Sequence, residues 1–340
     1  MNIHRQPGLQ NSVENPLILA IVVFVGAVYA STQTIILVSL PQMQGDLSAS
    51  IDQISWVVTG NIVASAVGIP PTAWLSARFG RKRLFLICIG CFTVSCLLLG
   101  NSTTLEEVVF WRIMQGLTGA PLIAISQAIA LDIYPKERQG MAMAIWSVGL
   151  IVGPVAAPTI GGYLTELGNW HIIFFAMVPL GMFSFVASMF VLPEWPPEKN
   201  LRFDWFGFVA VTIGIGAAQL TIDQGQRLDW FGSIEIIILT ILACMGLYIF
   251  IAHILTSKNP FLETGIFRDR NFSIGLITMF LYSPLIYIPM VLIPNMLEGL
   301  RDFPVVTIGL LLLPRGLGQI LGLSFAGRIV SKLDCRKLLV

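Results

Sequence analysis

The chain has 340 residues, of which 55% are hydrophobic and 11% are charged. Soluble domains usually carry about 25% charged residues, so this composition excludes an ordinary water-soluble fold and indicates a protein surrounded by lipid. The formal net charge of +1 gives no basic surface for nucleic acid. The five cysteines are an odd number and lie mostly in apolar runs, which argues against a disulfide framework.

Ten apolar stretches are long enough to cross the hydrocarbon core, which takes about 20 helical residues. They are predicted to be helices, because lipid offers no partner for backbone N–H and C=O groups. In chain order they cover residues 17–40, 54–76, 84–100, 108–131, 141–164, 170–192, 205–222, 230–255, 272–297 and 305–325. The sequence therefore predicts an all-α membrane protein with about ten spanning helices.

The basic residues are sorted between the two ends of these segments. With the N-terminus in the cytoplasm, the cytoplasmic side carries Arg5, Arg78, Arg81, Lys82, Arg83, Lys136, Arg138, Lys199, Arg202, Lys258, Arg268, Arg270, Arg328, Lys332, Arg336 and Lys337. The other side carries only Arg227 and Arg301. Cytoplasmic loops collect Lys and Arg, so the sequence predicts a plasma (cell inner) membrane protein in which both ends of this chain are cytoplasmic.

The chain also resembles itself. "AWLSARFGRKRL" at residues 73–84 aligns with "GRIVSKLDCRKL" at residues 327–338, and three basic positions coincide. Transporters are often built of two parallel halves. We therefore expect a cytoplasmic tail (1–16), a six-helix bundle (17–192), a linker (193–204), two inserted helices (205–255), a cytoplasmic loop (256–271) and an incomplete second half (272–340).

Two features inside the predicted spanning segments point to function. The fifth segment has a face almost without side chains, along which another helix can approach closely; its small and helix-bending residues are Gly149, Gly153, Pro154, Pro158, Gly161 and Gly162. In the fourth segment the permanent cation of Arg112 has to find a carboxylate, water or a carbonyl oxygen. Arg315 is a second charge within the segments, for which packing and function are equally good interpretations.

Polar residues that could face a central cavity are Thr32, Gln33, Thr34, Thr59, Asn61, Ser65, Gln115 and Gln127. Aromatic and methionine side chains could supply an apolar wall for an amphipathic ligand. The histidines are scattered, and no nucleophile, phosphate loop or metal-ligand pattern is present in the sequence. We therefore expect a protein that is not an enzyme and holds no metal.

Five motifs in order resemble the major facilitator superfamily, and within it the 14-helix drug:proton antiporter family of the EmrB/QacA type. They are "FGRKR" at 79–83, "RIMQGLTGAPLIAISQ" at 112–127, "GLIVGPVAAPTIGGYL" at 149–164, "DQGQRLDWFGS" at 223–233 and "LLLLPRGLG" at 310–318. The resemblance implies a major facilitator bundle with about ten of 14 helices present. It also implies a proton gradient as energy source without a cofactor, a part for Arg112 in proton coupling, and a cytoplasmic loop motif formed by Arg78, Gly80, Arg81, Lys82 and Arg83.

The sequence departs from the family where Thr32 stands at the usual Asp of the first segment. The expected proton carrier is absent there. Asp223 and Glu235 are other carboxylates, which we expect to be solvated groups near the outer ends of the inserted helices.

The resemblance favours a carrier that exports small amphipathic molecules by alternating access, in exchange for protons. Its partners would be the lipid bilayer, the substrate and an adaptor protein in the periplasm. Two alternatives stay open: a truncated or degenerate member that acts as a membrane partner without transport, and a symporter for a small nutrient.

Overall fold

A computed structural model describes residues 15–198, 203–257, 260, 262, 264–301, 311, 314–316, 318–319 and 321–322. In these ranges the protein is helical, without strands. Its α-helices are α1 (Pro16–Asp46), α2 (Ile51–Gly68), α3 (Thr72–Phe79), α4 (Arg81–Leu99), α5 (Leu105–Asp132), α6 (Gln139–Leu167), α7 (His171–Val191), α8 (Trp205–Gly225), α9 (Ile234–Thr256) and α10 (Arg270–Arg301).

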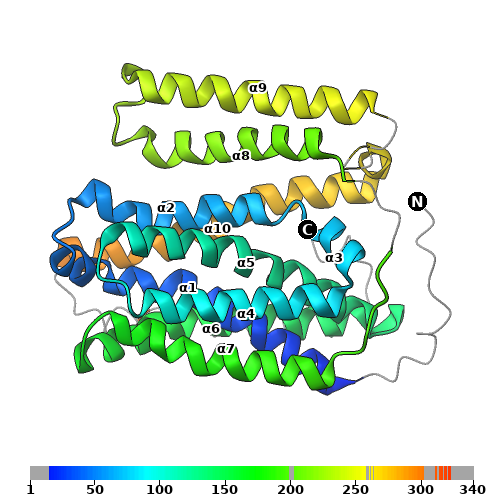
Figure 1. Cartoon of the computed structure of the whole chain (residues 1–340), viewed down its shortest axis with the longest axis horizontal. Helices are drawn as coiled ribbons and strands as arrows, with labels where there is room; N and C mark the ends of the chain where they lie inside the picture. The colour runs from blue at the N-terminus through cyan, green and yellow to red at the C-terminus, as the bar shows by residue number, and fades with distance from the viewer. Residues whose placement is uncertain are drawn as a thin grey trace.

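Seven of the helices in the described ranges are long and apolar enough to span a membrane, and the bent pair α2 and α3 can form an eighth span. The helices run nearly side by side along the long axis (Figure 1). This arrangement confirms the predicted all-α membrane fold. The expected segment at 305–325 lies mostly outside the described residues, so the structure does not complete the expected ten spans.

The predicted second segment, residues 54–76, is not one helix. α2 and α3 meet at an angle of 57° across a short break. Pro70 and Pro71 lie in this break, and proline has no N–H to continue the hydrogen-bond ladder. The break therefore turns the chain just before the basic loop.

Helix starts follow local side-chain caps. Ser50 and Gln53 form a capping box at α2, in which each side chain accepts a backbone N–H of the other residue. Thr104 and Glu107 form the same motif at α5. Asp204 caps α8 by accepting the N–H of Gly207 at 2.9 Å. These short polar stretches fix where the apolar spans begin.

Six spans make one bundle. α1 lies along α6, α2 lies along α5, and α4 packs between α5 and α7. Figure 1 shows α8 and α9 as a separate pair on the α2 side of this bundle. Apolar side chains of α9 such as Ile238, Met245 and Tyr248 are exposed, as expected for a surface covered by lipid. The division into bundle, inserted pair and second half stays a prediction.

Candidate functional site

Arg112 lies inside the bundle and is only 1% exposed. Its Nε donates to the carbonyl oxygen of Val57 on α2 at 3.1 Å, and its guanidinium also donates to Oε1 of Gln115 one turn along α5. Among the described residues, no carboxylate forms an ion pair with it. Of the partners that the sequence allowed, the structure uses a carbonyl oxygen, together with a side-chain amide.

Gln115 and Asn61 extend this network. The Gln115 amide donates to Sγ of Cys96 on α4 at 3.1 Å. The Asn61 amide donates to the backbone carbonyl of Arg112 at 2.8 Å. Both residues are fully buried. They join α2, α4 and α5 at the helix interfaces, and whether they also contact a substrate stays a prediction.

The threonines of α1 are buried as well. The Thr32 hydroxyl donates to the Tyr29 carbonyl of its own helix at 2.7 Å, and Thr34 donates to the carbonyl of Pro154 on α6 at 3.2 Å. Pro158 lies four residues after Pro154 and has no N–H, so the Pro154 carbonyl lacks its helical donor. Thr34 supplies that missing donor across the α1–α6 interface.

Other residues that were predicted to face a cavity are less deeply buried. Gln33 and Gln127 are half-buried, and Nε2 of Gln33 has no hydrogen-bond partner among the described residues. Ser65 is also half-buried, and its hydroxyl lies 2.9 Å from that of Tyr29. Whether any of them contacts a substrate stays a prediction.

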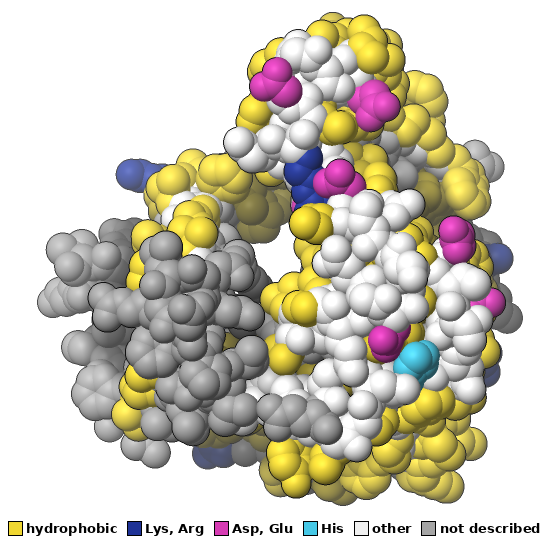
Figure 2. Space-filling view, turned by 90° about the vertical axis from the view of Figure 1, so that its left-hand side faces the viewer, with side chains coloured by type: hydrophobic (Ala, Val, Ile, Leu, Met, Phe, Trp, Pro, Cys, Tyr) yellow, Lys and Arg dark blue, Asp and Glu magenta, His cyan; other side chains and the backbone are white. Residues whose placement is uncertain are grey.

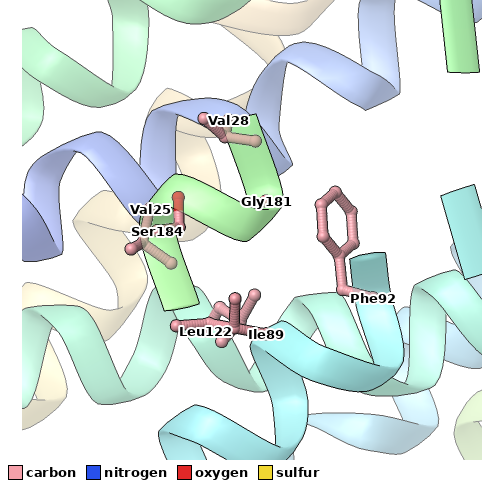
Figure 3. Close-up of a pocket in the computed structure, with 7 residues that line it drawn as sticks. All are labelled: Val25, Val28, Ile89, Phe92, Leu122, Gly181 and Ser184. Carbon is pink, nitrogen blue, oxygen red and sulfur yellow. The ribbon is translucent and has the colours of Figure 1, made fainter. Parts of the chain in front are cut away.

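The described bundle contains a small apolar gap between α1, α4, α5 and α7 (Figure 3). Val28, Phe92 and Leu122 are among the side chains around it. It leaves no room for a water molecule. This gap is a feature of packing and does not hold a substrate.

The glycines of α6 let α1 approach closely. A Cβ on Gly153 would lie 2.6 Å from the backbone carbonyl oxygen of Ala27, and a Cβ on Gly161 would lie 2.5 Å from Ile35. At Gly149 an added Cβ would collide with Val23. At Gly162 it would have ordinary contact with Val38 at 3.7 Å. The expected smooth face is thus present, and α1 is the helix that covers it.

A second close pair is α2 with α5. A Cβ on Gly68 would lie 2.8 Å from the backbone carbonyl oxygen of Leu117, and one on Gly116 would collide with the carbonyl oxygen of Asn61. Neither glycine was among the residues predicted to form a close helix contact. Gly116 lies within the second motif, residues 112–127, next to Gln115, and this is the signal that could have identified it.

The basic loop motif is part helix. Arg81, Lys82 and Arg83 form the first turn of α4 rather than a turn between helices. Positive charge is unfavourable at a helix N-terminus. Arg81 pairs with Asp132 at the end of α5, and Lys82 lies 3.4 Å from Glu194. These two ion pairs offset the unfavourable position of the charges.

Gly80 precedes this turn with a φ of +87°, a conformation that favours glycine. The segment after α7 crosses at this point, so a Cβ on Gly80 would lie 2.5 Å from the carbonyl oxygen of Trp195. The N–H of Glu198 also donates to the carbonyl of Ala77 at 2.8 Å. Arg78 takes part in an interaction as well, and Arg83 is exposed. The loop motif therefore anchors the start of the linker.

Arg315 is half-buried and has an interaction partner. Next to it, a Cβ on Gly316 would lie 2.8 Å from the side chain of Val155 on α6. This part of the chain thus lies against the bundle. Its role beyond packing stays a prediction.

Asp223 differs from the expected solvated group. It is half-buried near the end of α8, and its carboxylate accepts a hydrogen bond from the hydroxyl of Thr59 on α2. Thr59 is 2% exposed. The two residues are 164 positions apart, and no sequence pattern links them. Glu235, in contrast, is exposed at the start of α9, as expected.

The described residues contain no group of three or more His, Cys, Asp or Glu side chains that could hold a metal ion. Cys88 and Cys91, which formally spell C-x-x-C, both lie within α4. Cys88 is buried and Cys91 is exposed. The four described cysteines are free thiols.

Comparison with known proteins gives the family. The sequence pattern of the Major Facilitator Superfamily matches residues 22–340. The multidrug export protein EmrB of Haemophilus influenzae is 38% identical over 305 residues, which are 89% of this chain and 60% of that protein. EmrB of Escherichia coli K12 is 36% identical over 307 residues. The fatty acid resistance protein FarB of Neisseria gonorrhoeae is 33% identical over 317 residues.

The chain thus spans about 60% of the length of these relatives. Among solved structures, a proton:xylose symporter, XylE, is similar with a TM-score of 0.62 at 14% identity, covering 95% of this chain and 70% of that one. The human organic anion transporter MFSD10 has a TM-score of 0.50 at 14% identity, covering 93% of this chain and 85% of that one. At such low identity these likenesses show the fold alone.

Proposed function

Because this chain belongs to the Major Facilitator Superfamily, we propose that it acts as a membrane carrier, not an enzyme, and exports small amphipathic molecules in exchange for protons. The relatives named as multidrug export proteins support export, and the likeness covers most of this chain. The relative named for fatty acid resistance supports an amphipathic substrate. An adaptor protein in the periplasm is a further partner that we propose.

The observation that carries this proposal is the α1–α6 interface. A carrier that works by alternating access has to tilt helices against one another without breaking many specific contacts. Gly153 and Gly161 bring α1 and α6 so close that Ala27 and Ile35 of α1 lie against the positions where Cβ atoms of α6 would be. Pro154 and Pro158 interrupt the ladder of α6, and a helix bends most easily at such points. We therefore propose that this pair of helices changes its angle during transport.

The orientation follows from charge. The linker anchor at Arg81, Lys82 and Glu194 is at one end of the bundle, and the connection between α8 and α9 is at the other (Figure 1). Basic residues favour the cytoplasmic side. We place the loop motif and both ends of this chain in the cytoplasm of a cell whose plasma membrane holds the protein.

Proton coupling is assigned to the network around Arg112. A buried cation in the membrane is expensive, and such groups mark ion and proton pathways. Arg112 is held by Val57 and Gln115 without a carboxylate partner among the described residues. Since Thr32 cannot carry a proton, the counter-charge has to be elsewhere in the protein. The energy source that we propose is the proton gradient, with no cofactor.

The test is transport in reconstituted vesicles. We expect vesicles with an acidic lumen to accumulate ethidium or the neutral dye N-phenylnaphthylamine, and to lose the dye when an ionophore collapses the pH gradient. Arg112→Ala should abolish the gradient-driven part, while the exposed Glu235→Gln should leave it unchanged. Full gradient-driven accumulation by Arg112→Ala would refute the coupling role. No accumulation by the unmodified protein would support the non-transporting alternative.

A further inference from the structure

We propose that α8 and α9 move as part of the first six-span bundle during transport, so that the boundary between the two moving halves lies after α9. The inserted pair is then a fixed extension of the first half and not a flexible connection between the halves. The inference rests on the proposed function, because it concerns the alternating access of that carrier. It is carried by contacts within the pair and by contacts to the bundle at both of its ends.

α8 and α9 are packed together along their length. A Cβ on Gly246 would lie 2.6 Å from the backbone nitrogen of Gly214, so the two backbones touch at this level. At the end that we place in the cytoplasm, Nε2 of His253 lies 2.9 Å from the carboxylate of Asp204. At the other end, the ring of Trp230 lies against the last residue of α8. Close-packed contacts at three levels oppose sliding, so the pair moves as one unit.

At its outer end α8 is docked on α2 by hydrogen bonds. The hydroxyl of the buried Thr59 donates to the carboxylate of Asp223, and Arg227 donates to the hydroxyl of Ser55. The two α2 residues are four positions apart, as are the two α8 residues, and such residues share one face of a helix. Figure 2 looks onto this end and shows acidic and basic side chains where the upper helix pair meets the bundle.

The docking continues along α2 toward the middle of the membrane. Val63 follows Thr59 by one turn, and a Cβ on Gly216 of α8 would meet its side chain at 4.0 Å, an ordinary van der Waals distance. The same helix α2 is tied to α5 through Asn61 and Arg112. The stripe therefore joins α8 to a part of the bundle that is itself fixed.

At its cytoplasmic end the pair is held through the segment that precedes it. Besides the ion pair that Lys82 makes with this segment, the N–H of Glu198 donates to the carbonyl of Ala77 at 2.8 Å. The ring of Phe203, two residues before α8, has its centroid 4.6 Å from that of Trp74 on α3. The chain thus enters α8 from residues that already lie on the first bundle.

The chain beyond α9 is attached in a different way. Oδ1 of Asp269 accepts the N–H of Asn271 at 2.8 Å, and the hydroxyl of Ser273 donates to the carbonyl of Phe267 at 2.7 Å. These bonds tie the short helix η4 (Thr264–Arg268) to the start of α10. η4 therefore goes with α10, and the boundary falls between α9 and η4.

The opposite arrangement would carry α8 and α9 with the second half. The pair would then have to leave α2 in every transport cycle and break both hydrogen bonds between α2 and α8. The hydroxyl of Thr59, which is 2% exposed, would lose its acceptor each time. Buried polar groups in proteins are almost always hydrogen-bonded, so the contacts favour the fixed pair.

The first test is a disulfide within the proposed moving body. Val63→Cys and Gly216→Cys are introduced together into the full chain, whose five native cysteines are replaced. Oxidation should consume both thiols, because the two side chains lie in contact. Accumulation of N-phenylnaphthylamine in vesicles, driven by a pH gradient, should stay within about twofold of the reduced protein, since the link joins parts that move together. A link that stops transport, or thiols that do not react, would overturn the inference.

The matched control is a disulfide across the proposed boundary. A Cβ on Gly316, in the second half, would lie 2.8 Å from the side chain of Val155 on α6. Oxidation of the Val155→Cys and Gly316→Cys protein should lower accumulation at least about tenfold, because the halves can no longer rock, and reduction should restore it. Normal transport by this linked protein would contradict the boundary that we propose.

Spin-label distances give a readout that does not depend on transport. Ile69 at the end of α2, Val209 on α8 and Asn271 on α10 are exposed. In nanodiscs, N-phenylnaphthylamine should leave the distance between labels at 69 and 209 unchanged and should alter the distance between labels at 69 and 271. Equal changes in both distances would overturn the inference. The proposed function fails separately, if the reduced protein shows no accumulation driven by a pH gradient.

Discussion

The two close helix pairs of the bundle are built differently. α1 and α6 meet through glycines and, among the described side chains, share one hydrogen bond across their interface, from Thr34 to the carbonyl that Pro158 leaves without a donor. α2 and α5 are as close, yet Arg112 and Asn61 fasten them with hydrogen bonds in both directions. In the proposed carrier the first pair changes its angle, and the second pair keeps it. The difference teaches that a close approach of two helices does not by itself decide whether their angle can change. The hydrogen bonds across the interface matter as well.

The largest effect on stability should come from breaking the hydrogen bonds between α2 and α5. Arg112→Ala removes the bonds to Val57 and Gln115 and leaves a hole where a fully buried side chain was. We expect a loss of about 2–5 kcal/mol in the free energy of unfolding, as for other large buried side chains cut to alanine. Thermal unfolding in detergent measures it.

Arg112→Lys provides the matched control. It keeps a positive charge but cannot make the same forked contacts. It should therefore regain part of the stability and little of the gradient-driven transport. A lysine variant with normal coupling would mean that charge alone, without the hold on α2, performs the function.

The pair formed by α1 and α6 is tested at Gly153. Gly153→Ala places a Cβ 2.6 Å from the carbonyl oxygen of Ala27, and backbone cannot move aside as a side chain can. We expect about 1–3 kcal/mol of destabilisation, the usual cost of overpacking, together with slower transport. Gly162→Ala meets Val38 at an ordinary 3.7 Å. It should be neutral or, because alanine favours helix, more stable by up to about 1 kcal/mol. Equal effects of the two variants would contradict the account.

Thr34→Val should destabilise the protein less than Gly153→Ala does. This change leaves the carbonyl of Pro154 without a donor at nearly constant side-chain volume. The expected cost is about 1 kcal/mol, since hydrogen bonds between membrane helices are individually weak. Transport should continue at a rate close to normal. A complete loss of transport would show that this single bond, rather than the glycine face, governs the pair.

Much of the fold could be predicted because lipid imposes it. Long apolar runs, capping residues such as Ser50 and Thr104, and the glycine face of α6 are local properties of the chain. The partner of Asp223 could not be predicted. A sequence shows which residues share a face of a helix, but not which distant helix will cover that face. Nothing in the sequence around Thr59 indicates that its partner is Asp223.

The roles of the polar residues stay predictions, whereas their positions in the helices are defined. Thr32, Asn61 and Gln115 are polar residues in membrane helices, and such residues can line a cavity or join helices. The structure places them in helix interfaces, where the Thr32 hydroxyl bonds its own helix and the amides of Asn61 and Gln115 bond neighbouring ones. To tell whether such a residue lines a cavity or joins helices, its hydrogen-bond partners have to be known. These partners are defined only once the helices are packed together.

The most direct test of the account is aqueous accessibility from the outside of intact cells. Single cysteines at Arg83, in the first turn of α4, and at Phe231, between α8 and α9, would be placed in a chain whose five native cysteines are replaced. Both positions are exposed. A membrane-impermeant maleimide should label the Phe231→Cys protein in intact cells, and the Arg83→Cys protein only after lysis. Labelling at Arg83→Cys in intact cells would contradict the placement of this helical bundle in the membrane.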